Sequence, residues 1–351
     1  MRLNCSAWAK KKNKMSHKNV PIFIPHLGCP NQCVFCNQRS ISGCEAFDEA
    51  DVERQICEAL GTVRGEDEVE IAFFGGSFTG IDRGLMLRLL DVAQKYVDAG
   101  RVSAIRLSTR PDYINGEILS ILSRYAVKTV ELGLQSMDDR VLRASERGHT
   151  AEQARAACRA VVAAGISLVG QMMIGLPGSD IQSEIETAEE IASLGASAAR
   201  IYPTVVFYDT PLCQMAKDGE YTPLTNGEAA VRAAKVLRVL IERGVPCLRI
   251  GLCASEALTD ADRVYAGPNH PALGELVWNE YYYEEIQNAI READLLGGEA
   301  LLTVRESEIS KVVGQHRANV VRLERETGTR IRKVTGSAAC EGISVLPYVR
   351  N

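Results

Sequence analysis

Short apolar runs alternate with longer amphipathic stretches along most of the chain. Six apolar runs have the length of strands, at residues 20–27, 69–75, 103–109, 129–134, 166–175 and 197–204. Between them, apolar residues recur at the helical period over 48–60, 82–99, 115–124, 138–163 and 180–194. Strands that alternate with helices are typical of a parallel sheet covered by helices. We therefore expect an α/β fold with strands apolar on both faces, either a doubly wound sheet or a partial or full barrel.

The pattern becomes less regular after residue 205. Helical patterns over 226–243 and 281–296 flank a possible seventh strand at 245–252. Residues 297–351 then predict a strand, a helix, a turn, a second helix and a strand. We expect three regions: a disordered tail over 1–18, a core over 19–296 and a small basic α+β unit over 297–351.

The composition is that of a soluble globular enzyme, with 46% hydrophobic and 24% charged residues. No apolar run reaches the roughly 20 residues that span a bilayer, and the N-terminus lacks the apolar stretch of a secretion signal. We therefore expect a cytoplasmic protein. The first methionine of the natural chain could be Met15 instead of Met1, in which case residues 1–14 are an upstream extension.

The net charge of −5 argues against general binding of polyanions, but the charge is unevenly distributed. Residues 1–18 carry six Lys or Arg and no acid, and residues 300–351 carry nine Lys or Arg and five acids. The body of the chain is therefore acidic. This distribution predicts that any contact with nucleic acid is made by the two ends.

Three of the eleven cysteines form the most specific motif in the sequence. Cys29, Cys33 and Cys36 have the spacing C-x3-C-x2-C and directly follow the first predicted strand. Three thiolates in one tight loop can bind one metal centre, and a four-iron cluster normally takes four, so one iron would keep an open position. The alternative is a structural zinc site completed by His26 or Cys44. Because no second half-site follows downstream, the spacing favours the cluster.

This motif resembles the signature of the radical S-adenosylmethionine (radical SAM) superfamily, and Phe35 matches the aromatic residue often found there. The resemblance implies a partial (β/α)6-type barrel and a 4Fe-4S cluster on Cys29, Cys33 and Cys36. It also implies S-adenosylmethionine (SAM) on the open iron, cleaved to a 5′-deoxyadenosyl radical, and an external low-potential electron donor. The cofactors carry this chemistry, while the protein orients them and excludes solvent.

Glycine and polar residues follow the next four predicted strands. The carboxyl ends of parallel strands meet at one edge of a sheet, so these residues predict a cradle for the cofactor. The glycine pair resembles the superfamily motif that contacts the methionine amino group of SAM. For any one of these residues alone, capping or turn chemistry is the better interpretation. The candidates are Gly75, Gly76, Ser77, Ser108, Arg110, Gln135, Arg147 and Gln171.

Further segments resemble one branch of the superfamily. GGSFTG, STRPDYI, ELGLQS, ERGHT, IYPTVV and GPNHPALGE are similar to the Elongator catalytic subunit family and its short bacterial relatives. This similarity implies an RNA substrate, transfer RNA (tRNA) in particular. The chain ends too early for the acetyltransferase domain of that family, so we do not expect that activity.

A weaker resemblance, carried by GLPG and by the Gln–Arg elements, is to oxygen-independent coproporphyrinogen III oxidases. It implies an alternative, an oxidoreductase that acts on a small molecule such as a porphyrinogen. In those enzymes acidic residues would be expected where Ser108 and Gln171 stand. This difference counts against porphyrin chemistry.

The basic terminal unit resembles a KH-type RNA-binding element, in which a G-x-x-G loop between two helices holds the nucleic-acid backbone. Here the loop is Gly314-Gln315-His316-Arg317, with Arg317 in place of the second glycine. Arg322 and Lys333 would extend the positive surface. The alternative is a solvated helical hairpin that covers an edge of the core.

Two further possibilities stay open at this point. A non-catalytic RNA-binding protein with a structural metal would have the same terminal unit without the radical chemistry. Trp278 and the tyrosines at 281–283 could stack on bases, although such a cluster is more often a packing seam.

Overall fold

The fold was analysed in a computed structural model, which describes residues 17–29, 33–37, 47–63, 68–252, 258, 260–340 and 342–349. Within these ranges no helix has both the length and the apolar character needed to span a membrane. The first strand begins at His17, so His17 and Lys18 belong to the sheet and not to the tail predicted over 1–18. The rest of that tail lies outside the described residues.

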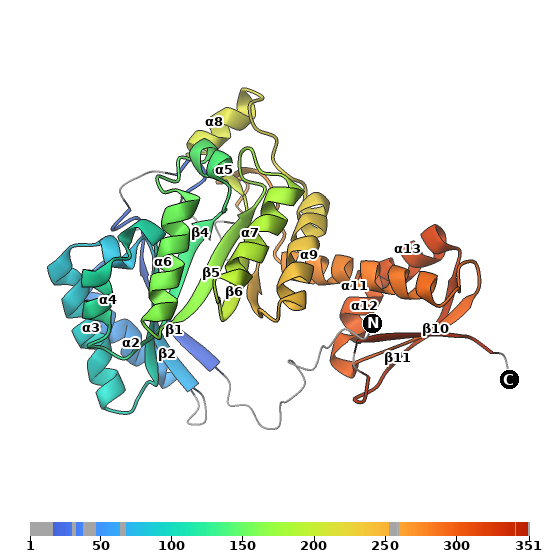
Figure 1. The fold of residues 1–351 in the computed structure, drawn as a ribbon, viewed down its shortest axis with the longest axis horizontal. Helices are drawn as coiled ribbons and strands as arrows, with labels where there is room; N and C mark the ends of the chain where they lie inside the picture. Colours follow the sequence, from blue (N-terminus) through green and yellow to red (C-terminus); the bar gives the residue numbers. More distant parts are fainter. Residues whose placement is uncertain are drawn as a thin grey trace.

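Seven parallel strands form the main sheet, and they follow one another in the sheet in the order of the sequence. An unbroken order, with every crossover in the same direction, makes a sheet curl toward a barrel, whereas a doubly wound sheet requires a reversal. The first and last strands do not pair, so the barrel is partial (Figure 1). The strands are β1 (His17–Ile24), β2 (Glu68–Gly75), β3 (Ala104–Thr109), β4 (Val127–Gln135), β5 (Ser167–Ile174), β6 (Ala198–Pro203) and β8 (Cys247–Ile250).

The sequence therefore predicted the α/β class and the partial barrel correctly, and the possible seventh strand is present as β8. Helices cover the convex face of the sheet (Figure 1). Three of them begin with a capping box, at Thr150, Asp180 and Thr225, which satisfies the first backbone amides of each helix. The covering helices are α2 (Val52–Gly61), α3 (Arg83–Asp98), α4 (Gly116–Leu122), α6 (Ala151–Ala163), α7 (Ile181–Ser193) and α9 (Asn226–Glu242).

The single helix predicted over 138–163 is wrong, because the chain forms two helices there. They are α5 (Asp139–Ala144) and α6, separated by a turn in which Glu146 and Gly148 have left-handed φ angles of 52° and 79°. Such a reversal ends a helix. It also brings Arg147 to the sheet, where its guanidinium donates to the Gly133 carbonyl at 2.6 Å.

The prediction that the strands are apolar on both faces is also wrong. Residues such as Phe73, Leu107 and Leu132 point toward the helices and are buried in the main apolar core. Their neighbours in sequence alternate to the concave face, where Arg106 and Glu131 stand on adjacent strands. The concave face is therefore lined with polar and charged side chains.

After β6 the chain forms three short elements that the sequence did not predict. They are β7 (Val206–Phe207), α8 (Pro211–Lys217) and β9 (Val264–Ala266). The two strands pair antiparallel as a small ribbon. The ribbon lies outside the main sheet.

The C-terminal unit is a mixed three-stranded sheet with two helices. Its strands β10 (Glu299–Val304), β11 (Arg330–Gly336) and β12 (Ile343–Pro347) have the order β11-β10-β12, and only β12 runs antiparallel to the central strand. Its helices are α12 (Ile309–Val313) and α13 (Ala318–Thr327). The predicted small α+β unit is therefore present, with β12 as an additional strand.

One long helix joins this unit to the barrel. α11 (Leu273–Glu292) begins eight residues before the helix predicted at 281. It packs on α9 and β8 of the barrel and also on α12, α13 and β12 (Figure 1). Buried residues of the unit, such as Leu302 and Leu323, belong to the same apolar core as the barrel. The unit is therefore fixed on the barrel and is not a separate tethered domain.

Candidate functional site

The loops that follow β1 and β2 are packed backbone against backbone. The Gly76 amide donates to the Ile24 carbonyl at 2.7 Å, and the Ser77 amide donates to the Leu27 carbonyl at 2.9 Å. A Cβ atom at Gly28 or at Gly76 would collide with a backbone carbonyl of the opposite loop, so this approach requires glycine. The glycine pair that the sequence assigned to the cofactor therefore also fixes the loop that carries Cys29.

The segment with the second and third cysteines is held from two sides. The Val34 amide donates to the Ser145 carbonyl at 3.2 Å, and the Val34 carbonyl accepts from the Leu212 amide at 2.9 Å. Asn37 donates to both carboxylate oxygens of Asp209 at 2.7 Å. Cys33, Val34 and Phe35 are buried in an apolar cluster that is separate from the main core of the barrel. The segment is thereby anchored between the end of α5 and the start of α8.

Two buried arginines lie beside the cysteines. The Arg147 guanidinium donates to the Cys33 sulfur at 3.4 Å, and Arg110 donates to the Arg147 carbonyl at 2.7 Å. Arg110 also forms a two-bond ion pair with Asp112, with both distances 2.9 Å. Burial raises the pKa of the Cys29 thiol, and the positive charges of Arg147 and Arg110 oppose that rise. Cations in this position favour thiolates and an anionic cluster bound to them.

Several polar atoms at this rim are buried without a hydrogen-bond partner among the described residues. They belong to Arg110 (Nη1), Arg147 (Nε), Gln135 (Oε1) and His149 (both ring nitrogens). Each such atom costs about 1–3 kcal/mol, so a cluster of them indicates a place where a polar ligand supplies the missing partners. Donors and acceptors beside three thiols fit a cluster with SAM, whose methionine part is polar.

The metal site itself is only partly described. Residues 30–32, which connect Cys29 to Cys33, and Cys44 lie outside the described residues. Among the residues that are described, no three His, Cys, Asp or Glu side chains are arranged to hold a metal. Cluster binding by Cys29, Cys33 and Cys36 stays a prediction, and so does the zinc alternative with His26 or Cys44.

The side chains of the other predicted cofactor residues are bonded to protein groups. The Ser77 hydroxyl is buried, pairs with the Thr109 hydroxyl at 2.8 Å and accepts from the Arg110 amide at 3.2 Å. Gln171 donates to the Ser108 hydroxyl at 3.4 Å and to the Glu131 carboxylate at 2.8 Å. The structure thus brings Arg110, Arg147 and Gln135 to the rim and turns the other three side chains toward protein partners.

Below the rim is a charged network that the sequence reasoning missed. Glu131 is fully buried and accepts from Arg106, Arg200 and Gln171 at 2.8–2.9 Å. Arg106 also binds Glu70 at 2.7 Å. Burial alone would raise the pKa of Glu131, but the hydrogen bond and charge of Arg200 outweigh it and hold that pKa below its usual range. The sequence does contain a signal for this network, because polar residues occupy every second position in and just after β3, at 106, 108 and 110.

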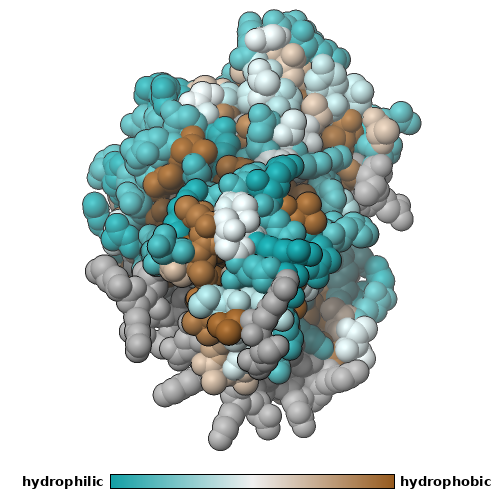
Figure 2. All heavy atoms as spheres, turned by 90° about the vertical axis from the view of Figure 1, so that its right-hand side faces the viewer, coloured by the Kyte–Doolittle hydropathy of each residue, from teal (hydrophilic) through white to brown (hydrophobic). Residues whose placement is uncertain are grey.

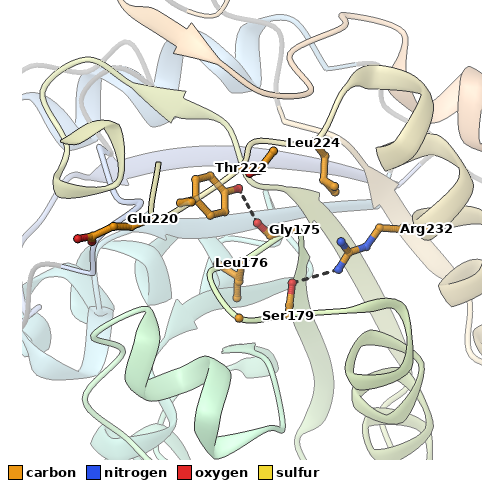
Figure 3. A pocket seen from close by; sticks show the side chains of 9 residues that line it. Gly175, Leu176, Ser179, Glu220, Thr222, Leu224 and Arg232 are labelled. Carbon is orange, nitrogen blue, oxygen red and sulfur yellow. Dashed lines mark hydrogen bonds between the residues drawn. The ribbon is translucent and has the colours of Figure 1, made fainter. Parts of the chain in front are cut away.

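A pocket of about 200 Å³ lies on the outer side of the loop after β5 (Figure 3). The Tyr221 hydroxyl donates to the Gly175 carbonyl at 2.6 Å, and Arg232 donates to Ser179 at 3.1 Å. Leu176 lines this pocket and also packs in the apolar cluster around Cys33. None of the three cysteines lines it, so it is separate from the predicted cluster site.

In the C-terminal unit, the predicted RNA-binding turn connects α12 to α13. Gln315, His316 and Arg317 are exposed, while Gly314 is buried with a φ of 75°. Lys333 is exposed on β11.

Arg322 is arranged differently. It donates to Glu280 at 2.8 Å and lies 3.7 Å from the centre of the Tyr283 ring, so it fastens α13 to α11. Tyr281, Tyr282 and Tyr283 are buried, which confirms the packing interpretation of this cluster.

Comparison with known families decides the class of the protein. The profile of the radical SAM superfamily matches residues 23–191, and that of the radical SAM C-terminal domain matches residues 196–283. The chain belongs to the radical SAM superfamily. It is therefore a radical SAM enzyme, and this membership sets aside the non-catalytic RNA-binding protein. A 4Fe-4S cluster and SAM are the cofactors that the superfamily implies.

Two curated relatives match this radical SAM enzyme over 63% and 60% of its length. The uncharacterized protein MJ0486 of Methanocaldococcus jannaschii is 29% identical over 235 residues, 63% of this chain and 71% of the relative. The tRNA uridine(34) acetyltransferase of the same organism is 27% identical over 232 residues, 60% of this chain and 42% of the relative. The chain thus spans less than half the length of that acetyltransferase.

A solved structure supports the fold. The Elp3 of Methanocaldococcus infernus, with residues 1–46 deleted, superposes with a TM-score of 0.60 at 22% identity, covering 78% of this chain and 64% of that one. At this identity the likeness shows the shared fold.

Proposed function

We propose that this radical SAM enzyme acts on RNA, and specifically on tRNA. The observation that carries the proposal is the exposed basic turn of the C-terminal unit, which α11 packs against the barrel that carries the cysteine loop. An enzyme that acts on one nucleotide of a large RNA needs a second contact to hold the rest of the molecule.

The turn has properties that suit the backbone of RNA. His316 and Arg317 have positive φ angles of 51° and 63°, which residues with side chains rarely adopt. Their side chains are exposed, and no carboxylate among the described residues pairs with Arg317. A cation without a local partner is free to pair with a phosphate, which releases counterions and contributes affinity.

The relatives add support for tRNA as the substrate class. Relatives that match 60% and 76% of this chain carry the name tRNA uridine(34) acetyltransferase. Because the match covers 42% of the M. jannaschii protein, we extend tRNA recognition to this chain and not acetyl transfer.

The rim residues have distinct roles in this proposal. Cys29, Cys33 and Cys36 would hold the cluster, and Arg110, Gln135 and Arg147 would contact SAM. When bound, these cofactors supply hydrogen abstraction by a radical. The chain itself neutralises the anionic groups with Arg110 and Arg147, and the packed loops after β1 and β2 keep the cysteines in place.

Anaerobic reconstitution tests the proposal. The reconstituted protein, reduced with dithionite, should form 5′-deoxyadenosine from SAM, and bulk tRNA should bind and stimulate that formation. Arg317→Glu should weaken tRNA binding about tenfold, because one phosphate contact becomes a repulsion. Arg159→Glu changes an exposed arginine of α6 on the barrel and serves as the matched control, with unchanged binding.

Two results would contradict the proposal. One is an enzyme that cleaves SAM but binds no tRNA at low salt. The other is turnover with coproporphyrinogen III that tRNA does not affect, which would favour the porphyrinogen alternative.

A further inference from the structure

A cluster of two tyrosines and a lysine stands on the surface next to the cysteine loop. Tyr208 follows β7, Tyr265 is in β9 and Lys217 ends α8. The two rings meet edge to face with centroids 5.5 Å apart, and the Lys217 ammonium lies 5.7 Å from the centre of each ring. We call these three residues the tyrosine platform.

Both rings are exposed to an unusual degree for aromatic side chains. Tyr208 is 47% exposed and Tyr265 is 36% exposed, whereas the neighbouring Phe207 is 1% exposed. Tyr208 is the first residue after β7, whose own residues Val206 and Phe207 are both buried. Phe207 packs inward with Val205 and anchors the ribbon, while Tyr208 points outward. The rings are therefore displayed on a fixed support.

The platform is connected to the cysteine loop through adjacent residues. Asp209, next to Tyr208, accepts two hydrogen bonds from Asn37, which follows Cys36 in the sequence. The Tyr208 amide donates to the Arg263 carbonyl at 3.1 Å, which fixes the residue on the opposite strand of the ribbon. A molecule resting on the rings would thus lie near the mouth of the barrel.

The charge of Lys217 indicates the kind of molecule. Arg263 is paired with Asp260, but Lys217 has no carboxylate partner within the described part of the chain. An exposed aromatic face beside an unpaired cation matches the bases and phosphates of a single-stranded nucleic acid. We propose that the tyrosine platform stacks an unpaired base of the RNA substrate next to the base that enters the barrel. This inference rests on the proposed RNA function and adds a site to it.

The test uses the full-length reconstituted enzyme and a short single-stranded RNA that contains 2-aminopurine, whose fluorescence falls when the base stacks. Tyr208→Ala and Tyr265→Ala should each weaken binding about tenfold and reduce the quenching, because one ring offers its face to the base and the other, nearly perpendicular to it, holds that ring in place. Tyr208→Phe and Tyr265→Phe keep the ring and should bind within about twofold of the wild type. Equal iron content and melting temperature show that the variants are folded.

Tyr348→Ala is the matched control, since Tyr348 is also exposed, at 37%, with Arg332 above its ring, but follows β12 and is part of neither the ribbon nor the basic turn. Its affinity and quenching should not change. The platform is overturned if the alanine variants bind and quench like the wild type, if the Phe variants lose as much as the Ala variants, or if Tyr348→Ala loses as much. If the wild type cleaves SAM but binds no RNA at all, the proposed function fails first, and the platform fails with it.

Discussion

The rim and the floor of the barrel carry the same residue types on one concave face, but their buried polar atoms differ in whether they have hydrogen-bond partners. The floor consists of Glu70, Arg106, Glu131, Gln171 and Arg200. There the buried carboxylate of Glu131 on β4 accepts from three side chains, on β3, β5 and β6. At the rim, Arg110, Gln135 and Arg147 each keep a buried polar atom without a partner among the described residues.

This difference suggests that the floor residues stabilise the fold and that the rim residues bind a ligand. Buried charges are stable only when they are paired and hydrogen-bonded, as on the floor. Unpaired buried groups cost stability and persist where a ligand completes them. We therefore expect changes on the floor to act on folding and changes at the rim to act on cofactor binding. The predictions below test that division.

The largest effect should follow loss of a cysteine. Cys36→Ser should abolish 5′-deoxyadenosine formation and reduce bound iron to background, because an iron–sulfur cluster is held by thiolates. Cys213→Ser changes a buried cysteine of the same apolar cluster and should keep both iron and activity. Iron analysis and visible absorption check this. Full iron binding by Cys36→Ser would show that other residues hold the metal.

On the floor, Glu131→Leu should lower the free energy of unfolding by about 3–5 kcal/mol, because it leaves Arg106 and Arg200 buried without their shared carboxylate. Urea unfolding measures this. Glu152→Leu on the surface of α6 is the control and should change stability by less than about 0.5 kcal/mol. A stable Glu131→Leu variant that had instead lost only SAM binding would place Glu131 in the cofactor site.

His149 should make stability depend on pH near neutrality. Burial, with the charge of Arg147, lowers the pKa of His149 to about 3, so the folded protein keeps this ring neutral while the unfolded chain takes up a proton below pH 6.5. The folded state should therefore be roughly 2 kcal/mol less stable at pH 5 than at pH 7. Carboxylates with lowered pKa values, such as Glu131, lose their contribution only at lower pH.

His149→Asn removes this titration, so its unfolding free energy should change less than the wild type between pH 7 and pH 5. Urea unfolding at both values gives the comparison. The same pH dependence in the variant and the wild type would assign the effect to other groups.

The smallest effect should come from Arg147→Lys at the rim. Lysine keeps the charge but donates from a single nitrogen, whereas Arg147 reaches Cys33 and Gly133 from two separate nitrogens of its planar guanidinium. We expect SAM binding to weaken about tenfold, while the free energy of unfolding changes by about 1 kcal/mol or less. Equilibrium binding and urea unfolding separate the two. A stability loss as large as that of Glu131→Leu would remove the distinction between rim and floor.

Much of the fold could be predicted because strands and helices differ in their hydrophobic period. The order of the strands in the sheet could not be predicted from this period, because it depends on which strand edges pair. The structure excluded a doubly wound sheet. The α5–α6 break was missed because a single reversal at Glu146 and Gly148 does not interrupt the apolar pattern.

The residues of the candidate site were partly predictable. Residues at strand ends, such as Arg110 and Gln135, could be placed at one edge by topology alone. The structural roles of Ser77 and Arg322 could not be predicted, because their hydrogen-bond partners, Thr109 and Glu280, are distant in sequence. Arg106 and Glu131 were overlooked because the strands were interpreted as uniformly apolar.

The continuous helix α11 has a consequence for the choice of RNA. Its 20 residues extend for about 30 Å, and it is packed against both the barrel and the C-terminal unit. An RNA bound by the basic turn would thus be presented to the barrel at a set distance. Figure 2 shows the molecule from the side of the C-terminal unit. This fixed distance between the turn and the barrel would select RNA molecules by their overall shape. A change in the length of an RNA stem should therefore abolish modification even when the target nucleotide and its neighbours are intact.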